Sequence, residues 1–332
     1  MKIIVDGYGG DNAPLEIIKG ASLAVEELDI DIILTGDVTE IKKIATENNI
    51  SLNRIELVNT TEVIDMEDDA MAVIKDKKNS SMAVGLNMLA KNEGDAFVSA
   101  GNSGALTVGA TMIAKRIKGI KRAAFAPIIP TANGFAMLLD SGANADCRAE
   151  MLLQFGVMGS IYMDKVMNVK NPRVGLANIG TEPTKGTQLQ LDAYELLEKS
   201  NLNFIGNVEG RDIPINGCDV LVADGFTGNL IVKTYEGVAL ALMGKIKDMF
   251  SKNLKTKLAA ALIMNDLKEM KKQFDYNEYG GSAILGISKP VFKCHGSAKA
   301  KTLKSAISLA KQYVDGNVTQ EIENSLKNKE VI

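Results

Sequence analysis

The chain contains little of what dedicated nucleic-acid-binding proteins rely on. Its 332 residues include no tryptophan, a single histidine and only seven prolines, and aromatic residues make up 5%. Few aromatic side chains leave few platforms on which bases can stack. There are 38 basic and 41 acidic residues, for a net charge of −3. This balance argues against a nucleic-acid-binding protein, because such proteins usually carry a strongly basic domain.

Metal-binding and disulfide motifs are also missing. The three cysteines, Cys147, Cys218 and Cys294, are widely spaced and form no CxxC pair, which disfavours a zinc motif and a disulfide framework. One histidine excludes a two-histidine metal site. An all-oxygen magnesium site stays open, but no clustered acidic motif supports it. We therefore expect neither a metal nor an organic cofactor.

The sequence shows no sign of a secretion signal or a spanning segment. Its first residues, Met-Lys-Ile-Ile-Val-Asp, hold too short an apolar run for a signal peptide. The charge-free stretch 123–139 contains Pro127 and Pro130, which would break a spanning helix, and it is shorter than such a helix requires. These features favour a cytoplasmic protein.

Short apolar runs alternate with amphipathic stretches along the chain. The runs lie at 3–5, 32–34, 96–98, 136–139, 174–177 and 220–223. The helical patterns that follow them lie at 13–28, 40–48, 102–115, 149–163, 189–199 and from about 228 onwards. Repeated strand–helix units predict an α/β fold with a mostly parallel sheet covered by helices. No linker-like segment divides the chain, so we expect one domain over residues 1–332.

Residues 245–272 depart from this alternation. They contain eight lysines and three acidic residues, a local net charge of 8 − 3 = +5. Leu254, Leu258 and Leu262 recur at every fourth position and so share one face of a helix. A basic amphipathic helix of this kind is typical of a membrane surface contact. Packing of the three leucines in a core or a dimer interface explains the pattern equally well.

Five of the expected strands end in turns rich in glycine, asparagine and aspartate, at 6–14, 99–105, 140–144, 178–182 and 224–229. Ligands of open α/β sheets bind beyond the carboxyl ends of the strands, where glycines let backbone N–H groups approach an anion. We therefore predict a broad cleft for an anionic or polar ligand, although each turn alone also suits a structural role. The candidate ligand-binding residues are Asp6, Gly9, Gly10, Asn12, Ser99, Gly101, Asn102, Ser103, Asn144, Asn178, Gly180, Asp224, Gly225 and Gly228. No turn carries a dinucleotide or P-loop motif, which disfavours dehydrogenases and nucleotidases.

Three further residues are candidates for catalysis. Lys185 follows the fourth turn, and Asn229 opens the helix after the fifth. Both would stabilise a common anion if these strand ends lie side by side; a surface lysine and a helix cap are the alternative. His295 is the only histidine, so any histidine-dependent nucleophile must use it, although a lone histidine is more often structural.

Several long stretches resemble the PlsX-type phosphate acyltransferases. The resemblance is carried by DGYGGDNAP at 6–14, SAGNSGA at 99–105, LDSGANADC at 139–147, QFGVMGS at 154–160, NIG at 178–180, DGFTGN at 224–229 and CHGSAKAK at 294–301. Two departures are modest: Gly7 and Tyr8 stand where the family usually has Ala-Met, and 181–184 is less acidic than usual. The matches extend from residue 1 to about 315.

This resemblance implies a homodimer with a three-layer α/β/α, Rossmann-like fold, related to the phosphotransacetylase and isopropylmalate dehydrogenase type. A helical segment near 245–275 is expected to project from it. The implied activity transfers a long-chain acyl group from acyl carrier protein to inorganic phosphate, which gives acyl phosphate for phospholipid synthesis. A membrane glycerol-3-phosphate acyltransferase would then consume the product. Members of the family associate peripherally with membranes, which favours a membrane contact for Leu254, Leu258 and Leu262.

The residue chemistry is compatible with this reaction. Phosphate is already nucleophilic near neutral pH, and a thiolate is a fair leaving group, since the pKa of a thiol is about 8.5. The enzyme must chiefly position the reactants and stabilise the oxyanion, which amides and lysines achieve without a cofactor. Two other functions stay open: a short-chain phosphotransacetylase that uses acyl-coenzyme A, and a non-catalytic membrane scaffold. A covalent cysteine intermediate also stays open as an alternative to direct transfer.

Overall fold

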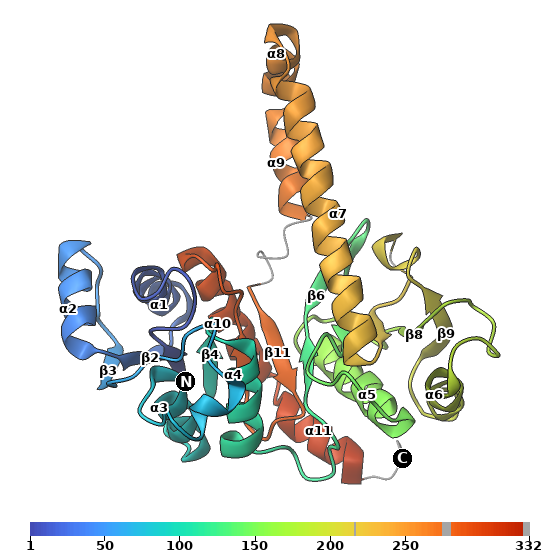
Figure 1. The fold of residues 1–332 in the computed structure, drawn as a ribbon, viewed down its shortest axis with the longest axis horizontal. Helices are drawn as coiled ribbons and strands as arrows, with labels where there is room; N and C mark the ends of the chain where they lie inside the picture. Colours follow the sequence, from blue (N-terminus) through green and yellow to red (C-terminus); the bar gives the residue numbers. More distant parts are fainter. Residues whose placement is uncertain (216, 274–279, 328–332) are drawn as a thin grey trace.

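The computed structural model describes residues 1–215, 217–273 and 280–327 (Figure 1). The strands form two sheets. The seven-stranded sheet has the order β3 (Ile55–Asn59), β2 (Asp31–Gly36), β1 (Lys2–Asp6), β4 (Ala96–Ser99), β12 (Val291–Lys293), β11 (Ser282–Leu285), β5 (Ala124–Ala126). The five-stranded sheet has the order β6 (Ile128–Thr131), β7 (Gly134–Leu139), β10 (Val220–Val222), β8 (Val174–Asn178), β9 (Phe204–Glu209).

Most neighbouring strands are parallel, as the sequence predicts. The exceptions are β11, which is antiparallel to both β12 and β5, and β6, which is antiparallel to β7. Within the residues that the structure describes, the sequence pattern accounts for six strands but misses the other six, among them the three-residue strands β5 and β12. A strand this short carries no readable periodicity, so its place in a sheet comes only from its long-range partners.

Helices cover the sheets on both sides. They are α1 (Leu15–Leu28), α2 (Val38–Glu47), α3 (Ser81–Ala90), α4 (Ser103–Gly109), α5 (Ala149–Lys165), α6 (Gln188–Glu198), α10 (Ala300–Asp315) and α11 (Val318–Lys327). The helix expected over 102–115 is α4 followed by a π-helical turn, Ala110–Ala114. On β1, Ile3 and Val5 pack in one buried cluster and Ile4 in another. Side chains of a strand alternate between faces, so both faces are buried and the expected three layers are confirmed.

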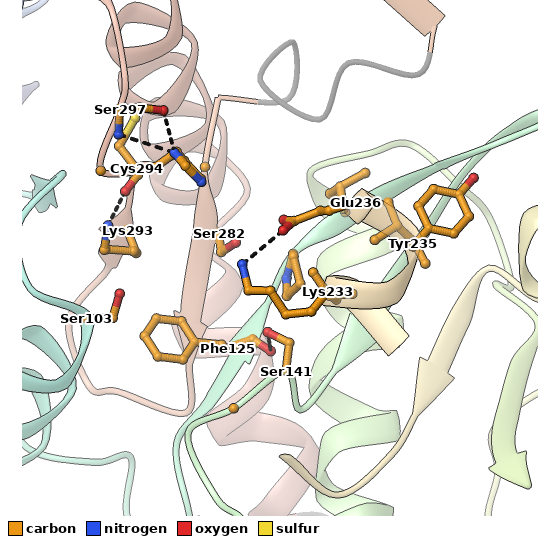
Figure 2. A pocket seen from close by; sticks show the side chains of 18 of the residues that line it. Ser103, Phe125, Ser141, Lys233, Tyr235, Glu236, Ser282, Lys293, Cys294 and Ser297 are labelled. Atoms are coloured by element: carbon orange, nitrogen blue, oxygen red, sulfur yellow. Dashed lines mark hydrogen bonds and ion pairs between the residues drawn. The ribbon is translucent and has the colours of Figure 1, made fainter. Parts of the chain in front are cut away.

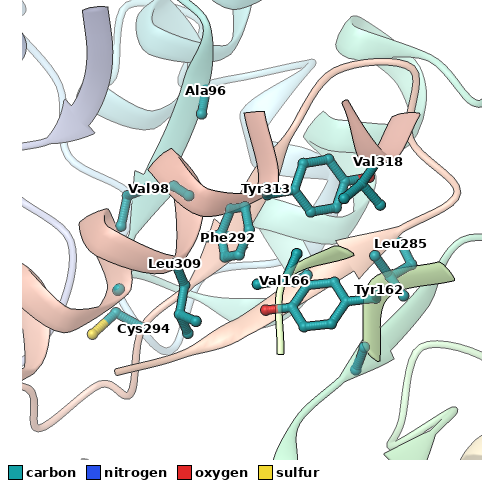
Figure 3. Close-up of a cluster of buried hydrophobic side chains, with 14 of the residues drawn as sticks. Ala96, Val98, Tyr162, Val166, Leu285, Phe292, Cys294, Leu309, Tyr313 and Val318 are labelled. Carbon is teal, nitrogen blue, oxygen red and sulfur yellow. The ribbon is translucent and has the colours of Figure 1, made fainter. Parts of the chain in front are cut away.

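The two sheets share one continuous core. Tyr162 of α5, beside the five-stranded sheet, faces Tyr313 of α10 with 6.0 Å between ring centroids. Phe292 of β12 packs edge-to-face on Tyr313 at 5.6 Å. All three rings are buried (Figure 3). Such aromatic pairs stabilise a contact beyond the area they bury, so this cluster helps to hold the helix beside one sheet against the helix and strand of the other.

Three helices form an arm that stands away from the sheets: α7 (Gly225–Ser251), α8 (Leu254–Leu262) and α9 (Met264–Gln273) (Figure 1). The expected projecting segment is therefore confirmed, but it is broken into separate helices. One break lies before α8, where the Asn253 side chain accepts a hydrogen bond from the Thr256 backbone N–H at 3.0 Å and caps the new helix. None of the helices in the described part of the chain is long and apolar enough to cross a membrane.

The three leucines of α8 are exposed at the end of this arm. Leu254, Leu258 and Leu262 expose 74%, 61% and 89% of their surface. Packing in the core of this chain is therefore excluded as the reason for their spacing. A membrane contact and a contact with another chain both remain compatible with it.

Candidate active site

A cavity of about 690 Å³ lies where the two sheets meet the base of the arm. Its walls come from segments far apart in the sequence: β5 and β6, the start of α7, and the stretch from Lys293 to Ser297 after β12. Figure 2 shows the Lys293 side of the cavity facing the α7 side, with Phe125 and Ser141 between them. The cavity thus lies beyond strand ends, as expected for an α/β fold.

Lys293 is a cationic side chain held in this cavity, and the sequence analysis did not select it. It is the last residue of β12 and pairs in register with Ser99 of β4. Its ammonium donates to the backbone oxygen of Ala100 at 3.2 Å and to that of Cys294. Burial lowers the pKa of Lys293 to about 8, while the negative charges of Asp11 and Asp6 oppose part of the shift. The sequence pattern did not predict the three-residue strand β12 that Lys293 ends, so the sequence offered no strong signal for this lysine.

His295 lies two residues further along and is held in one tautomer. Its Nδ1 accepts a hydrogen bond from the backbone N–H of Ser297 at 3.2 Å and lies 2.8 Å from the Ser297 hydroxyl. A backbone N–H only donates, so the proton of the neutral ring is on Nε2. Burial and then the charge of Lys293 lower the pKa of His295. The ring is therefore neutral at neutral pH and acts as a hydrogen-bond donor through Nε2.

The opposite side of the cavity is the first part of α7. Asn229, Lys233 and Glu236 line it on successive turns, and Lys233 forms an ion pair with Glu236 at 2.9 Å (Figure 2). Ser103, at the start of α4, also lines the cavity. Two lysines, an amide, a neutral histidine and several hydroxyls thus surround one space, together with the carboxylates of Asp11 and Glu236. Such a set of donors suits an anion that carries several oxygen atoms.

Of the predicted site residues, Ser103, Asn229 and His295 are the ones that line the cavity. Several others do not line the cavity but hold the segments that form it. The buried Asp6 carboxylate accepts hydrogen bonds from the hydroxyls of Ser81 at 2.5 Å and Ser99 at 2.6 Å, and burial raises its pKa. A Cβ at Gly9 would lie 2.6 Å from that carboxylate and 2.7 Å from the Gly101 nitrogen. Glycine is therefore required at position 9 for close packing.

The first predicted turn, residues 6–14, also forms hydrogen bonds with the loop that carries His295. The backbone N–H of Asp11 donates to the Gly296 oxygen at 2.8 Å, and the Asn12 side chain donates to the Ser297 oxygen at 3.0 Å. Gly10 has φ +98° and faces the same Gly296 oxygen. Gly10 and Asn12 therefore act as positioning residues for His295, rather than as ligand contacts.

Asn102 and Asn144 are structural in the same sense. Asn102 caps α4 by accepting from the Ala105 N–H at 3.0 Å, and it donates to the Met66 oxygen at 3.0 Å. Asn144 donates through its backbone and side chain to the buried Asp140 carboxylate, at 2.7 and 3.0 Å. Both amides are therefore occupied in holding turns.

Another group of predicted residues anchors the start of α7. Asp224 accepts from the Thr227 N–H at 2.8 Å and caps the helix. The Gly225 N–H donates to the Asn144 oxygen at 2.8 Å. A Cβ at Gly228 would lie only 1.9 Å from the Asp140 oxygen. These contacts hold the start of α7 close to the end of β7 and thereby position Asn229.

The fourth predicted turn lies apart from the cavity. The Asn178 side chain donates to the backbone oxygen of Lys185 at 3.0 Å and accepts from the Ile179 N–H at 2.8 Å. Asn178, Gly180 and Lys185 all lie after β8, and none of them lines the cavity. Lys185 is exposed. Its catalytic role stays a prediction, whereas Lys293 supplies a lysine inside the cavity.

Comparison with known proteins assigns the chain to a family. A family model described as "Fatty acid synthesis protein" matches residues 1–321. The chain belongs to this family. It is 48% identical over 328 residues to the "Phosphate acyltransferase" of Caldanaerobacter subterraneus subsp. tengcongensis, covering 98% of each chain. It is 44% identical to that of Clostridioides difficile (strain 630), covering 97% of this chain and 95% of the relative. The resemblance to the PlsX-type phosphate acyltransferases is therefore confirmed.

Solved structures share the fold of this family member at low sequence identity. The EutD phosphotransacetylase from Staphylococcus aureus gives a TM-score of 0.62 at 15% identity, covering 95% of this chain and 94% of that one. A phosphotransacetylase from Streptococcus pyogenes gives 0.63 at 16% identity, covering 97% and 94%. These likenesses confirm the expected relation to the phosphotransacetylase fold and concern the fold alone.

Proposed function

We propose that this phosphate acyltransferase transfers a long-chain fatty acyl group from acyl carrier protein to inorganic phosphate. The observation that carries the proposal is the two-sided character of the cavity. Lys293 and His295 on one side and Asn229 and Lys233 on the opposite side supply charge and donors, and the β5–β6 segment supplies apolar side chains. An anionic nucleophile and an alkyl chain need this combination.

The polar residues have distinct roles in the proposed reaction. Phosphate binds against the Lys293 ammonium and the Nε2–H of His295, which neutralise and orient it. One phosphate oxygen attacks the thioester carbonyl carbon; the new C–O bond forms, and the C–S bond breaks with its electron pair leaving on sulfur. The Asn229 amide and Lys233 stabilise the charge that develops on the carbonyl oxygen. No strong base is required, because phosphate supplies its own anionic oxygen.

The arm provides a contact with the membrane in which the product is used. Three exposed leucines on α8 are accompanied by Lys252, Lys255 and Lys257, all exposed. Apolar insertion together with attraction to anionic lipid is the mode of an interfacial helix. An acyl phosphate is an amphiphile, so a peripheral enzyme would pass it directly to a membrane glycerol-3-phosphate acyltransferase.

A homodimer would cover a second exposed surface on the arm. Val238, Leu242 and Met249 expose 62%, 58% and 55% of their surface and lie on the side of α7 away from the cavity. Their spacing of four and seven residues places them on one helix face. Exposed apolar rows of this kind are usually covered by another chain.

A steady-state assay tests the proposed activity. Acyl phosphate formation is measured with long-chain acyl–carrier protein and with acetyl-coenzyme A, each with and without phosphate. We expect phosphate-dependent product from the carrier-protein donor. Activity with acetyl-coenzyme A alone would identify a short-chain phosphotransacetylase, and no product from either donor would indicate a scaffold.

A further inference from the structure

The cavity continues along one face of α7 as an apolar row. Val232, Tyr235, Ala239 and Met243 all line the cavity. They follow one another at three- and four-residue intervals and so share a face of the helix. The row starts beside Asn229 and leads away from the polar part of the cavity.

A second apolar wall faces this row. It is formed by residues of β5, β6 and the link between them: Phe125, Pro127, Ile128, Ile129 and Pro130. The hydroxyl of Tyr235 donates to the backbone oxygen of Pro130 at 2.6 Å and joins the two walls. Pro127 and Pro130 have no backbone N–H that would need a partner in this wall. Two apolar walls held at a fixed separation suit a flexible alkyl chain.

The row is long enough to hold a long-chain acyl group. Asn229 and Met243 are 14 residues apart, which corresponds to about 21 Å along a helix at 1.5 Å per residue. Two opposed acyl chains span a bilayer core of about 30 Å, so one chain extends over about 15 Å. Leu240, on the rim of the cavity, is 69% exposed, and an alkyl chain beside it would cover that surface.

We propose that this apolar row is the binding groove for the acyl chain of the donor, with the thioester at Asn229 and the methyl end directed along α7 toward α8. This assignment rests on the proposed function and names the residues that measure chain length. Ala239 lies ten residues from Asn229, about 15 Å along the helix, and Met243 about 21 Å. Side-chain bulk at these two positions therefore limits the chain at different lengths. The same direction brings the methyl end toward the exposed leucines, so product leaves the groove toward the membrane contact.

Two matched alanine-to-phenylalanine substitutions on α7 test the groove. Ala239→Phe places a ring in it, whereas Ala241→Phe makes the same change two residues later, at an exposed position that does not line the cavity. The readout is the rate of acyl phosphate formation with a 16-carbon donor divided by that with an 8-carbon donor. We expect this ratio to fall about tenfold or more in Ala239→Phe and to stay unchanged in Ala241→Phe.

Met243→Trp supplies an independent second variant. Its ring lies four residues beyond position 239, about 6 Å further along. An extended chain advances about 3.5 Å over three bonds, so the loss of activity should begin at donors about five carbons longer than for Ala239→Phe. Such a shift is expected if the groove measures chain length, whereas general damage to the fold would lower the rate with donors of every length.

Four results would overturn or redirect the assignment. An unchanged ratio in folded Ala239→Phe, or the same onset of loss in both cavity variants, would reject the groove. A change of oligomeric state in Ala239→Phe with the ratio preserved would instead assign the row to a contact between copies. Failure of the unmodified protein to form acyl phosphate from any donor would reject the proposed function, which is a separate outcome.

Discussion

At the scale of single residues, the position of Lys293 decides how the site handles an anion. Its ammonium donates to the backbone oxygens of Ala100 and Cys294, and burial lowers its pKa to about 8, while the charges of Asp11 and Asp6 oppose part of that shift. The protonated form predominates below that pH and attracts phosphate. The neutral form above it does not.

Activity at low phosphate should therefore fall as pH rises through about 8. Lys293→Arg should remove this alkaline limb, because the arginine guanidinium stays charged over the whole pH range measured. Lys293→Ala should lose about 10²–10³ in rate. His295→Gln is the control, since it should retain turnover together with the alkaline limb. Rates measured from pH 6.5 to 9.5 check this. A flat profile for the unmodified protein, or an intact limb in Lys293→Arg, would contradict the assignment.

The same assay examines the lysine that the sequence favoured. Lys185→Ala removes an exposed side chain outside the cavity, while Lys293→Ala removes one inside it. A loss of about 10²–10³ in Lys185→Ala would restore its predicted catalytic role. If Lys293→Ala loses activity to this extent and Lys185→Ala does not, the anion binds at the end of β12.

At the scale of elements, the contact between α7 and β7 sets the geometry of the site. Gly228 lies against the backbone oxygen of Asp140, which a Cβ would approach to 1.9 Å. Asp140 is itself fixed, because its carboxylate accepts from the backbone N–H groups of Phe125 at 2.9 Å and Asn144 at 2.7 Å. The Asp140 backbone cannot shift without breaking these hydrogen bonds, so α7 must move if a larger residue replaces Gly228.

Gly228→Ala should therefore lower the free energy of unfolding by about 1–3 kcal/mol and reduce kcat, because Asn229 moves with the helix. Gly237→Ala is the matched control in the same helix, where a Cβ meets nothing within 4 Å. It should raise stability by up to about 1 kcal/mol and leave the rate unchanged. Thermal unfolding and steady-state rates check both. Equal effects of the two substitutions would mean that the close approach of α7 to β7 is unimportant.

At the scale of the whole molecule, charge is divided between the arm and the rest of the chain. Residues 245–272 carry +5 in a chain of −3, so the remainder carries −3 − 5 = −8. An anionic surface therefore attracts the end of the arm and repels the rest of the chain. The molecule would approach such a surface with α8 first, which places the exposed leucines in contact with lipid.

Vesicle co-sedimentation tests this orientation. Binding should require anionic lipid and weaken with salt, since each lysine near such a surface contributes about 1 kcal/mol. Leu258→Glu should reduce it, because the charge opposes apolar insertion. Leu23→Glu, at a 37%-exposed position on α1, is the control and should bind like the unmodified protein. Full binding by a Leu258→Glu variant that keeps its activity and its oligomeric state would instead assign α8 a structural role.

Much of this architecture is readable from local sequence. The alternation of apolar runs and helical patterns predicts the α/β fold, because six of the strands and the helices that follow them leave readable patterns in the chain. Glycine-rich turns mark the strand ends, and the lysine- and leucine-rich stretch marks the arm. These signals need no knowledge of distant contacts.

Only the tertiary structure decides which polar residues face a ligand. Asn102 and Asn144 have the composition of binding residues, yet their hydrogen bonds are used inside turns. Lys293 leaves no local signal strong enough to select it, because its place depends on β12 pairing with β4, almost 200 residues earlier. Periodicity reports the face of an element, whereas a cavity forms between elements. The sequence by itself therefore determines the fold class and the turns, and the packing of α7 against the two sheets determines the site.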